Sequence, residues 1–219
     1  MKRIHAIYGA LVALALLPGC DPSPPAPDLA AVEAASGAFK TCAACHGAEG
    51  EGNPTLQAPA LVNLDSDYLA AQLDKFRSGL RGAHPEDTQG QLMAGQSDYY
   101  ADDAAVAALV AQIDSFPDVL PPVTFADADL PNGKDRYNMI CGACHGPDGV
   151  GNATLEAPSL RGIDDWYLAE QYAKFGNGQR GSHADDRLGR QMAAMGGVLQ
   201  TEENARDVAA YLLSLGLDD

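Results

Sequence analysis

The stretch CAACH at residues 42–46 decides how this chain folds, and it returns 99 residues later as CGACH at residues 141–145. The match continues without a gap from position 42 to position 93, where 27 of the 52 positions are identical to those 99 residues further on. Chance alone would give only a few identities. The chain is therefore a tandem duplication, and each copy is expected to form a small domain of about 90 residues.

A Pro-rich segment separates the two copies. Residues 117–131 contain four prolines and several acidic residues, a composition that ends one helix before the next begins. We therefore expect one domain at residues 29–116, this linker, and a second domain at residues 132–219.

Both copies show helical periodicity, and no convincing alternating strand pattern is present. Acidic or hydroxyl residues before the last helix of each copy, Asp102 and Thr201, are typical N-terminal caps. The predicted fold is all-α. The helices are expected over residues 29–40, 68–76 and 106–113 in the first copy and over 133–140, 167–175 and 208–215 in the second.

The N-terminus has the features of an export signal. Two basic residues precede an apolar run at residues 6–17, which is too short to span a bilayer. The sequence LPGC ending at Cys20 resembles a bacterial lipobox, so residues 1–19 are expected to be a lipoprotein signal peptide and Cys20 the lipid-modified first residue. Ordinary secretion without lipid is the alternative. Residues 20–28 contain four prolines and are expected to form an extended tether, which would hold a periplasmic protein at the membrane.

The charge is strongly acidic, with 14 Lys and Arg against 30 Asp and Glu and a net charge of −16. This balance excludes nucleic acid as a partner, because its phosphates would repel the protein. It favours a basic or neutral docking partner approached by electrostatic steering, although solubility alone is an equally good explanation.

Each Cys-x-x-Cys-His motif matches the attachment pattern of a c-type haem, in which two thiols add to the vinyl groups and the histidine binds the iron. A thioredoxin-like pair would need a βαβ context, and a zinc site would need a further pair of ligands. We therefore predict two covalently bound haem c groups. Their attachment residues are Cys42, Cys45 and His46 in the first copy and Cys141, Cys144 and His145 in the second.

The sixth iron ligand must come from elsewhere in each copy. Met93 and Met192 each follow the motif histidine by 47 residues and are the only methionines that superpose under the repeat. Met195 is a rival in the second copy, but its counterpart is Gln96, a poor ligand. We predict Met93 and Met192 as the axial ligands.

A His/Met pair occupies both axial positions and leaves no site for oxygen, peroxide or a small-molecule substrate, so the chemistry expected is outer-sphere electron transfer. Two further histidines, His84 and His183, are also in register, but each follows an Arg-Gly dipeptide in a polar loop. We interpret them as surface residues or neighbours of the haem propionates.

The chain after the signal peptide resembles the cytochrome c4 type of dihaem class I cytochrome c. The first copy has a Gly-x-x-Gly-x-Gly-Asn loop from Gly47, Ala-Pro-x-Leu from Ala58, Tyr-Leu-x-x-Gln-x-x-x-Phe from Tyr68, and Met93 before the last helix. The second copy repeats each of these 99 residues later. The resemblance implies two tandem class I cytochrome c domains, each a few helices wrapped around one covalently bound haem.

The resemblance also assigns residues around the haems. In class I cytochromes a proline carbonyl in this loop holds the iron-binding histidine, which would be Pro59 for His46 and Pro158 for His145. Two arginines are implied to lie near haem propionates, although a solvated loop charge is a nearly equal interpretation. These are Arg81 and Arg180.

The resemblance further implies an electron carrier of a bacterial respiratory chain, working from a quinol-oxidising complex towards a terminal oxidase or reductase, and not itself an enzyme. Residues 81–93 also resemble c domains associated with haem–copper oxidases. A fixed haem subunit of an oxidase or dehydrogenase complex is therefore an alternative, and a dihaem peroxidase is a more distant one. The lipobox is a departure from the family, whose members are often soluble or loosely membrane-bound.

Overall fold

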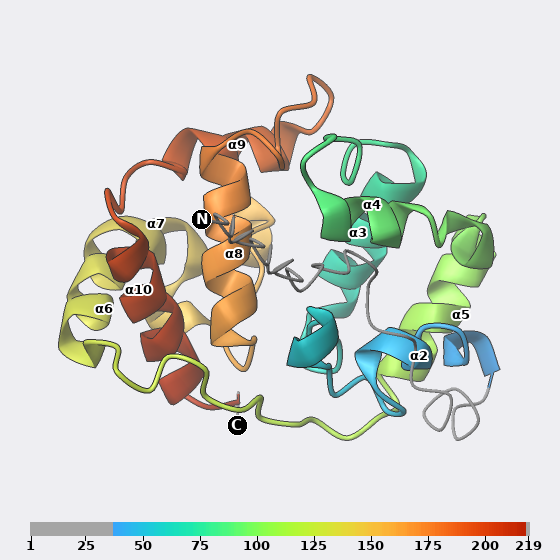
Figure 1. Ribbon diagram of the computed structural model, residues 1–219, viewed down its shortest axis with the longest axis horizontal. Coiled ribbons are helices and arrows are strands. Elements are labelled where there is room, and N and C mark those ends of the chain that lie inside the picture. The colour runs from blue at the N-terminus through green and yellow to red at the C-terminus, as the bar shows by residue number, and fades with distance from the viewer. Residues whose placement is uncertain (1–36, 218–219) are drawn as a thin grey trace, which may run out of the picture.

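The computed structural model describes residues 37–217. The expected signal peptide (1–19), the tether (20–28), Cys20 and most of the helix expected over residues 29–40 lie outside the described residues. The described chain folds into two helical lobes joined by an extended segment (Figure 1).

The described part of the first lobe, from residue 37 on, contains four α-helices and three short 3₁₀ turns. They are η1 (Gly37–Phe39), α2 (Ala43–His46), η2 (Pro54–Leu56), α3 (Ser66–Arg77), α4 (Thr88–Ala94), η3 (Ser97–Tyr100) and α5 (Asp103–Ile113).

The second lobe repeats the order of the α-helices but differs in its short turns, with no 3₁₀ turn between its last two described helices. Its elements are α6 (Leu130–Arg136), a π-helical turn η4 (Tyr137–Cys141), α7 (Gly142–His145), η5 (Pro147–Gly149), η6 (Ala153–Leu155), α8 (Asp165–Gly176), α9 (Arg187–Met195) and α10 (Glu202–Ser214). Within residues 37–217 the only β-type pairing is an isolated bridge in each lobe. The predicted all-α fold is thus confirmed.

The middle and last helices of each copy form where the periodicity predicts them. Asp102 accepts a hydrogen bond from Ala105 N at 2.8 Å and Thr201 accepts one from Asn204 N at 3.2 Å, so both predicted caps are present. Helix α6 starts at Leu130, three residues before the predicted start, because Asp129 caps it. Helices α4 and α9 were not predicted, since each is short and begins within a polar segment.

The first lobe has a core between α3 and α5. Helix α3 contributes Leu69, Leu73 and Phe76, and α5 contributes Val106, Leu109, Val110 and Ile113. Phe39 and Tyr100 lie at the centre of this cluster and are 0% and 1% exposed. Burying such side chains contributes about 1.5–3 kcal/mol each, so this cluster fixes the frame on which the shorter helices rest.

The second lobe reaches the same arrangement by a different local route. Tyr137 precedes Cys141 by four residues, whereas the core residue Phe39 precedes Cys42 by three. The π-helical turn accommodates the additional residue. The Tyr137 ring is therefore also fully buried, against Tyr211 and Leu212 of α10.

The two lobes face each other through α3 and α8, and their polar contacts come in pairs related by the 99-residue register. Ala60 N donates to Asp164 Oδ2 at 2.8 Å, and Ser159 N donates to Asp65 Oδ2 at 2.9 Å. The second contact is the first with the lobes exchanged, because Ser159 is the counterpart of Ala60 and Asp65 is the counterpart of Asp164. The interface therefore has approximate two-fold symmetry.

The connecting segment is bound to both lobes. Val119 O accepts from Asn63 Nδ2 at 2.7 Å, and the backbone N–H groups of Thr124 and Phe125 each donate to Asp165 Oδ2 at 2.9 Å. Among residues 37–217, none of the helices combines the length and apolar composition needed to cross a bilayer.

Candidate metal centres

Each Cys-x-x-Cys-His motif forms a single helical turn. In the first lobe His46 N donates to Cys42 O at 2.9 Å, and Cys45 N donates to the same oxygen at 3.1 Å. Cys42 is half-buried and Cys45 is exposed. Gly47 follows with φ +86°, a conformation that favours glycine and turns the chain away directly after the histidine. The second lobe repeats this turn.

The two motif histidines are buried and identically oriented. His46 Nδ1 lies 2.8 Å from the carbonyl oxygen of Pro59, and His145 Nδ1 lies 3.0 Å from that of Pro158. A carbonyl oxygen only accepts, so Nδ1 carries the proton and donates. The other ring nitrogen, Nε2, then keeps a free lone pair for a metal.

Burial lowers the pKa of both imidazoles, while the hydrogen bond to the proline carbonyl opposes this change. Both rings are therefore neutral at physiological pH, as a metal ligand must be.

The cysteine motifs lack the ligands of a structural zinc site. Burial raises the pKa of Cys42 and of Cys141 to about 11, and it also raises that of Cys45. A structural zinc site needs four protein ligands, whereas each motif offers two thiols and one imidazole. Within residues 37–217, His, Cys, Asp and Glu form no cluster of three or more suited to a metal ion.

The predicted methionine ligands lie on the two unpredicted helices. Met93 on α4 packs against the core of the first lobe together with Cys42, and its carbonyl accepts from Tyr100 Oη at 2.7 Å. Met192 is half-buried at the equivalent position of α9. Met195 lies at the end of α9 and is 38% exposed. Met93 and Met192, which superpose under the 99-residue repeat, therefore also occupy equivalent positions in the two lobes.

Glycines allow the Arg-Gly loop of each lobe to pack directly on its Met-bearing helix. A Cβ atom at Gly82 would lie 2.3 Å from Gly90 O, and one at Gly181 would lie 2.2 Å from Gly189 O. Such distances leave no room for any side chain, so the loop and the helix of each lobe are in backbone contact.

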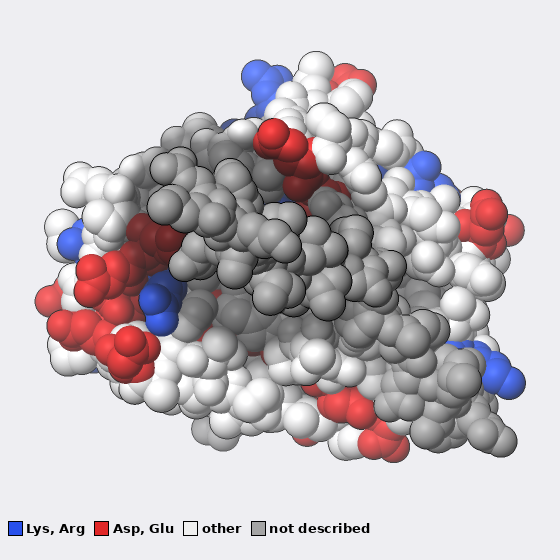
Figure 2. All heavy atoms as spheres, viewed as in Figure 1, with Lys and Arg blue, Asp and Glu red and all other residues white. Residues whose placement is uncertain are grey.

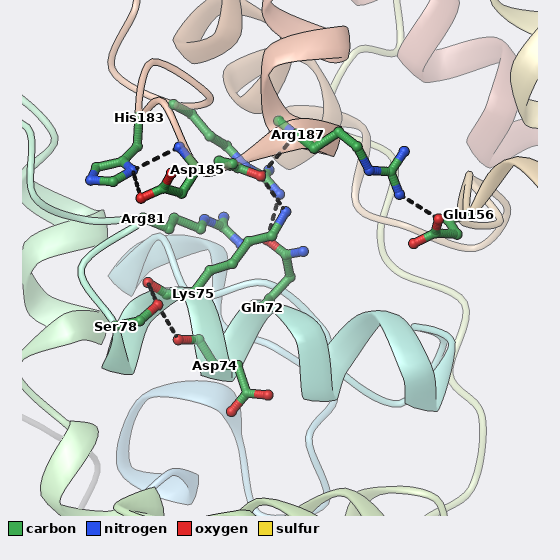
Figure 3. Close-up of polar contacts among 12 residues, drawn as sticks. Gln72, Asp74, Lys75, Ser78, Arg81, Glu156, His183, Asp185 and Arg187 are labelled. Atoms are coloured by element: carbon green, nitrogen blue, oxygen red, sulfur yellow. Dashed lines mark hydrogen bonds and ion pairs between the residues drawn. The ribbon is translucent and has the colours of Figure 1, made fainter.

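Arg81 is not a solvated loop charge, as one interpretation of the sequence had it. It is only 7% exposed, and its guanidinium stacks over the Phe76 ring at 4.5 Å. It donates from Nη1 to Gln72 Oε1 at 3.0 Å and from Nη2 to Tyr167 Oη and Gln171 Oε1, both at 2.9 Å. Two of these three partners belong to the opposite lobe, and Figure 3 shows Arg81 beside the third, Gln72 of α3.

Arg180 makes the corresponding contacts, related to those of Arg81 by the approximate two-fold symmetry. It donates to Gln171 Oε1 at 2.9 Å and, across the boundary, to Tyr68 Oη and Gln72 Oε1 at 2.8 Å. Burial alone raises the pKa of Tyr68, but the positive charges of Arg180 and Arg81 outweigh burial and lower it.

The hydrogen-bond partners of both guanidinium groups are thus neutral oxygen atoms. Two buried positive charges of this kind suit a group that brings carboxylates, as the propionates of haem do.

His84 and His183 lie in the loops after these arginines. Each Nδ1 accepts a backbone N–H from two residues further on at 3.2 Å, so each ring caps its own turn. His84 is half-buried and His183 is exposed. Both line a shallow cleft of about 310 Å³ formed by the two loops.

Sequence reasoning missed the residues that join the lobes. A signal for them was present, because these polar residues are conserved between the two copies although no haem chemistry requires them. They are Asp65, Lys75 and Asp87 and their counterparts Asp164, Lys174 and Asp186.

Two Cys-x-x-Cys-His turns with buried, oriented histidines in a tandem all-α chain define a dihaem c-type cytochrome, an electron-transfer protein with two covalently bound haem c groups. The cytochrome c family matches residues 32–116 and 130–216, and the chain belongs to this family. Within it, this is a cytochrome c4-like dihaem protein.

Three similar proteins support this assignment. Cytochrome c4 from Pseudomonas aeruginosa is 34% identical over 170 residues, covering 75% of this chain and 82% of the relative. The thiosulfate dehydrogenase electron acceptor from Stutzerimonas stutzeri (strain A1501) is 31% identical over 189 residues, covering 83% and 82%. The crystal structure of reduced recombinant cytochrome c4 from Pseudomonas stutzeri is 26% identical with a TM-score of 0.61, covering 88% of this chain and all of that one.

Proposed function

We propose that this protein is a periplasmic electron carrier of a bacterial respiratory chain, and not an enzyme. The observation that carries the proposal is the pair of equivalent centres, each with a buried neutral histidine and a methionine-bearing helix. When bound, each haem supplies a reversible one-electron iron couple. The chain's own residues hold that group, exclude water from it and present two centres within one compact molecule.

Each centre is proposed to be closed at both axial positions. In the first, His46 and Met93 bind the iron, and in the second His145 and Met192 do so. The carbonyls of Pro59 and Pro158 fix the histidine rings. The thioether links are made by Cys42, Cys45, Cys141 and Cys144.

Arg81 and Arg180 are proposed to neutralise haem propionates at the boundary between the lobes. Each buried guanidinium group already donates a hydrogen bond across the boundary, Arg81 to Gln171 and Arg180 to Gln72. A carboxylate brought to this place would receive charge-assisted hydrogen bonds in a region shielded from water.

The donor is proposed to be a quinol-oxidising complex and the acceptor a terminal oxidase or reductase. A thiosulfate dehydrogenase is a second candidate donor, because one relative with 31% identity is named as the electron acceptor of that enzyme. Figure 2 shows one face of the molecule, on which acidic side chains gather over the region of α6 and α10. Exposed acidic residues in and beside these helices are Asp127, Asp129, Asp135, Glu202 and Glu203.

Stopped-flow reduction of the holoprotein by each purified donor tests this proposal. The physiological donor should reduce it at a rate that falls as ionic strength rises, because the acidic surface steers a basic partner. A stable stoichiometric complex after detergent extraction would instead support a fixed subunit. Carbon monoxide binding by the native reduced protein, or rapid peroxide turnover, would contradict closed centres and favour a peroxidase.

The layout and location of the chain complete the proposal. Residues 29–116 and 132–219 are proposed as the two domains, joined by residues 117–131. Cys20 is proposed to carry a lipid that anchors the protein to the membrane. Replacing Cys20 with Ser should move the protein from the membrane fraction to the soluble periplasmic fraction, and a wild-type protein that is already soluble would contradict the anchor.

A further inference from the structure

Helices α4 and α9 are each held at the N-terminus by a buried carboxylate. Asp87 Oδ1 accepts from Gly90 N, and Asp186 Oδ1 accepts from Gly189 N, both at 2.9 Å. The two aspartates are 2% and 3% exposed. A helix as short as α4 is not stable by itself. The position of the methionine, six residues after each cap, therefore depends on that cap.

The same carboxylate oxygens bind a lysine from the opposite lobe. Lys75 Nζ, from α3 of the first lobe, lies 2.7 Å from Asp186 Oδ1 of the second. Lys174 Nζ, from α8 of the second lobe, lies 2.7 Å from Asp87 Oδ1 of the first. Figure 3 shows Lys75 beside Arg81, between α3 and the segment of the second lobe that carries His183. Each methionine-bearing helix is thus capped partly by the other lobe.

Both ion pairs are largely shielded from water, which makes the loss of either partner costly. The lysine side chains are 17% and 11% exposed, and the aspartate side chains are 3% exposed. Attraction between charges is stronger away from water, and removal of one partner leaves the other charge buried without compensation. A carboxylate in that state is drawn towards water and away from the glycine N–H that it caps.

The opposite side of each centre shows the same crossed pattern. Ala60 directly follows Pro59, which orients His46, and its N–H is bound by Asp164 of the second lobe at 2.8 Å. Ser159, which follows Pro158, is bound by Asp65 of the first lobe at 2.9 Å. Both the histidine side and the methionine side of each centre are therefore fixed from across the boundary.

We propose that Lys75 is a positioning residue for Met192 and that Lys174 is a positioning residue for Met93, each acting in the lobe to which it does not belong. This rests on the axial ligands proposed above. The two devices are not identical, because Lys174 also pairs with Glu170 at 2.5 Å, whereas the counterpart of Glu170 in the first lobe is Ala71. Loss of Lys174 leaves two carboxylates unpaired and should have the larger effect.

The test uses holoprotein in which only one centre at a time keeps a methionine ligand, so that the Met–iron signal comes from that centre alone. The M93H variant should keep the near-infrared Met–iron band of the second centre only, and M192H that of the first only. K75Q is then introduced into each background, and the band and the midpoint potential of the remaining Met-ligated centre are measured.

K75Q should remove at least half of the band in the M93H background, lower that centre's potential, and leave the band in the M192H background unchanged. K174Q should do the reverse. K75R, which keeps the charge, should restore the band, and so should K75Q combined with D186N, which keeps a capping oxygen without leaving a buried charge. Arg77→Gln is the matched control, because Arg77 on the same helix forms only exposed pairs within its own lobe.

Three outcomes would overturn the proposal: a K75Q effect on the first centre, an equal effect on both centres, or no effect on either. Failure of the ligand assignment is visible separately, because M93H and M192H would then leave the original band at full strength. Should K75Q not fold, K75Q/D186A is measured beside K75Q/D186N, since neither carries an unpaired buried charge at this place. Only K75Q/D186A lacks the capping oxygen, so only it should weaken the band of the second centre, and equal bands would contradict the proposal.

Discussion

At the level of single residues, Met192 and Met195 lie on the same helix but differ in environment. Met192 occupies the place equivalent to Met93, whereas Met195 is 38% exposed. Replacing Met192 with Ala should abolish about half of the near-infrared Met–iron absorbance, because one of two equivalent ligands is lost. Replacing Met195 with Ala should leave it intact. The opposite result in near-infrared spectra of the two holoprotein variants would make Met195 the ligand.

Two buried tyrosines should make stability sensitive to alkali. Burial raises the pKa of Tyr100 and of Tyr137 to about 12, whereas an unfolded tyrosine titrates near 10. The contribution of these protonated hydroxyls to the free energy of unfolding is complete below pH 10. It is lost as the pH rises from about 10 to about 12, because only the unfolded state releases the proton in that range. The loss should be on the order of 2 kcal/mol for each tyrosine.

Urea unfolding of Y100F between pH 8 and pH 12 checks this dependence. The variant should be less stable at pH 8 by about 1 kcal/mol, since Met93 O loses its hydrogen-bond donor. Its stability should nevertheless fall less steeply above pH 10 than that of the wild type. Tyr99, which is 58% exposed, provides the control, and Y99F should follow the wild-type profile. Identical slopes for Y100F and wild type would contradict the assignment.

Several site residues could be predicted from the sequence because their chemistry is local. The Cys-x-x-Cys-His turn and the identity of the proline that binds His46 follow from spacing and family resemblance. The environment of Arg81 could not be predicted, since its burial results from Tyr167 and Gln171, which belong to the other copy. A single copy gives no sign that such partners approach.

At the level of elements, Gly189 is required by the cap of α9. A Cβ atom there would lie 2.0 Å from Asp186 Oδ2, closer than any real contact. Alanine normally stabilises a helix relative to glycine, but G189A should displace the carboxylate and lower the free energy of unfolding by about 1–3 kcal/mol. The second centre's Met–iron band should weaken with it. Gly197 has open space around its Cβ position, so G197A should be neutral in the same urea-unfolding measurement.

The elements that sequence periodicity predicted are those with a continuous apolar face, such as α3 and α5. Helices α4 and α9 escaped prediction because each is short and begins within a polar segment, where an aspartate cap and a glycine mark the start instead of a long apolar run. The π-helical turn before Cys141 was not predicted either. It becomes visible only when Tyr137 and Phe39 are seen to fill the same place in the two cores.

For the whole molecule, the paired contacts should make the two lobes unfold together. Replacing both Asp65 and Asp164 with Ala removes the acceptors for Ser159 N and Ala60 N at the boundary. Leaving two such donors unpaired should cost about 1–3 kcal/mol each. Calorimetry should show one transition for the wild type and two for the double variant. A single transition in both proteins would mean that the lobes are coupled chiefly through other contacts.

The pairing of the lobes through α3 and α8 lay beyond prediction, although the duplication itself was evident from the sequence. Duplication specifies two similar domains but not which faces meet. The unexplained identities at Asp65, Lys75 and Asp87 are the residues that make the boundary, because a two-fold contact requires the same residue on both sides.

The exchange of roles across the boundary has a consequence for the origin of the molecule. Each contact at this boundary occurs twice, with the two lobes exchanged. Such self-complementarity is typical of the interface of a homodimer, and here the two halves are joined into one chain. The linker makes association intramolecular, so the pairing no longer depends on protein concentration. Fusion also frees the halves to diverge, as they have begun to do where Glu170 stands opposite Ala71 and Met195 opposite Gln96.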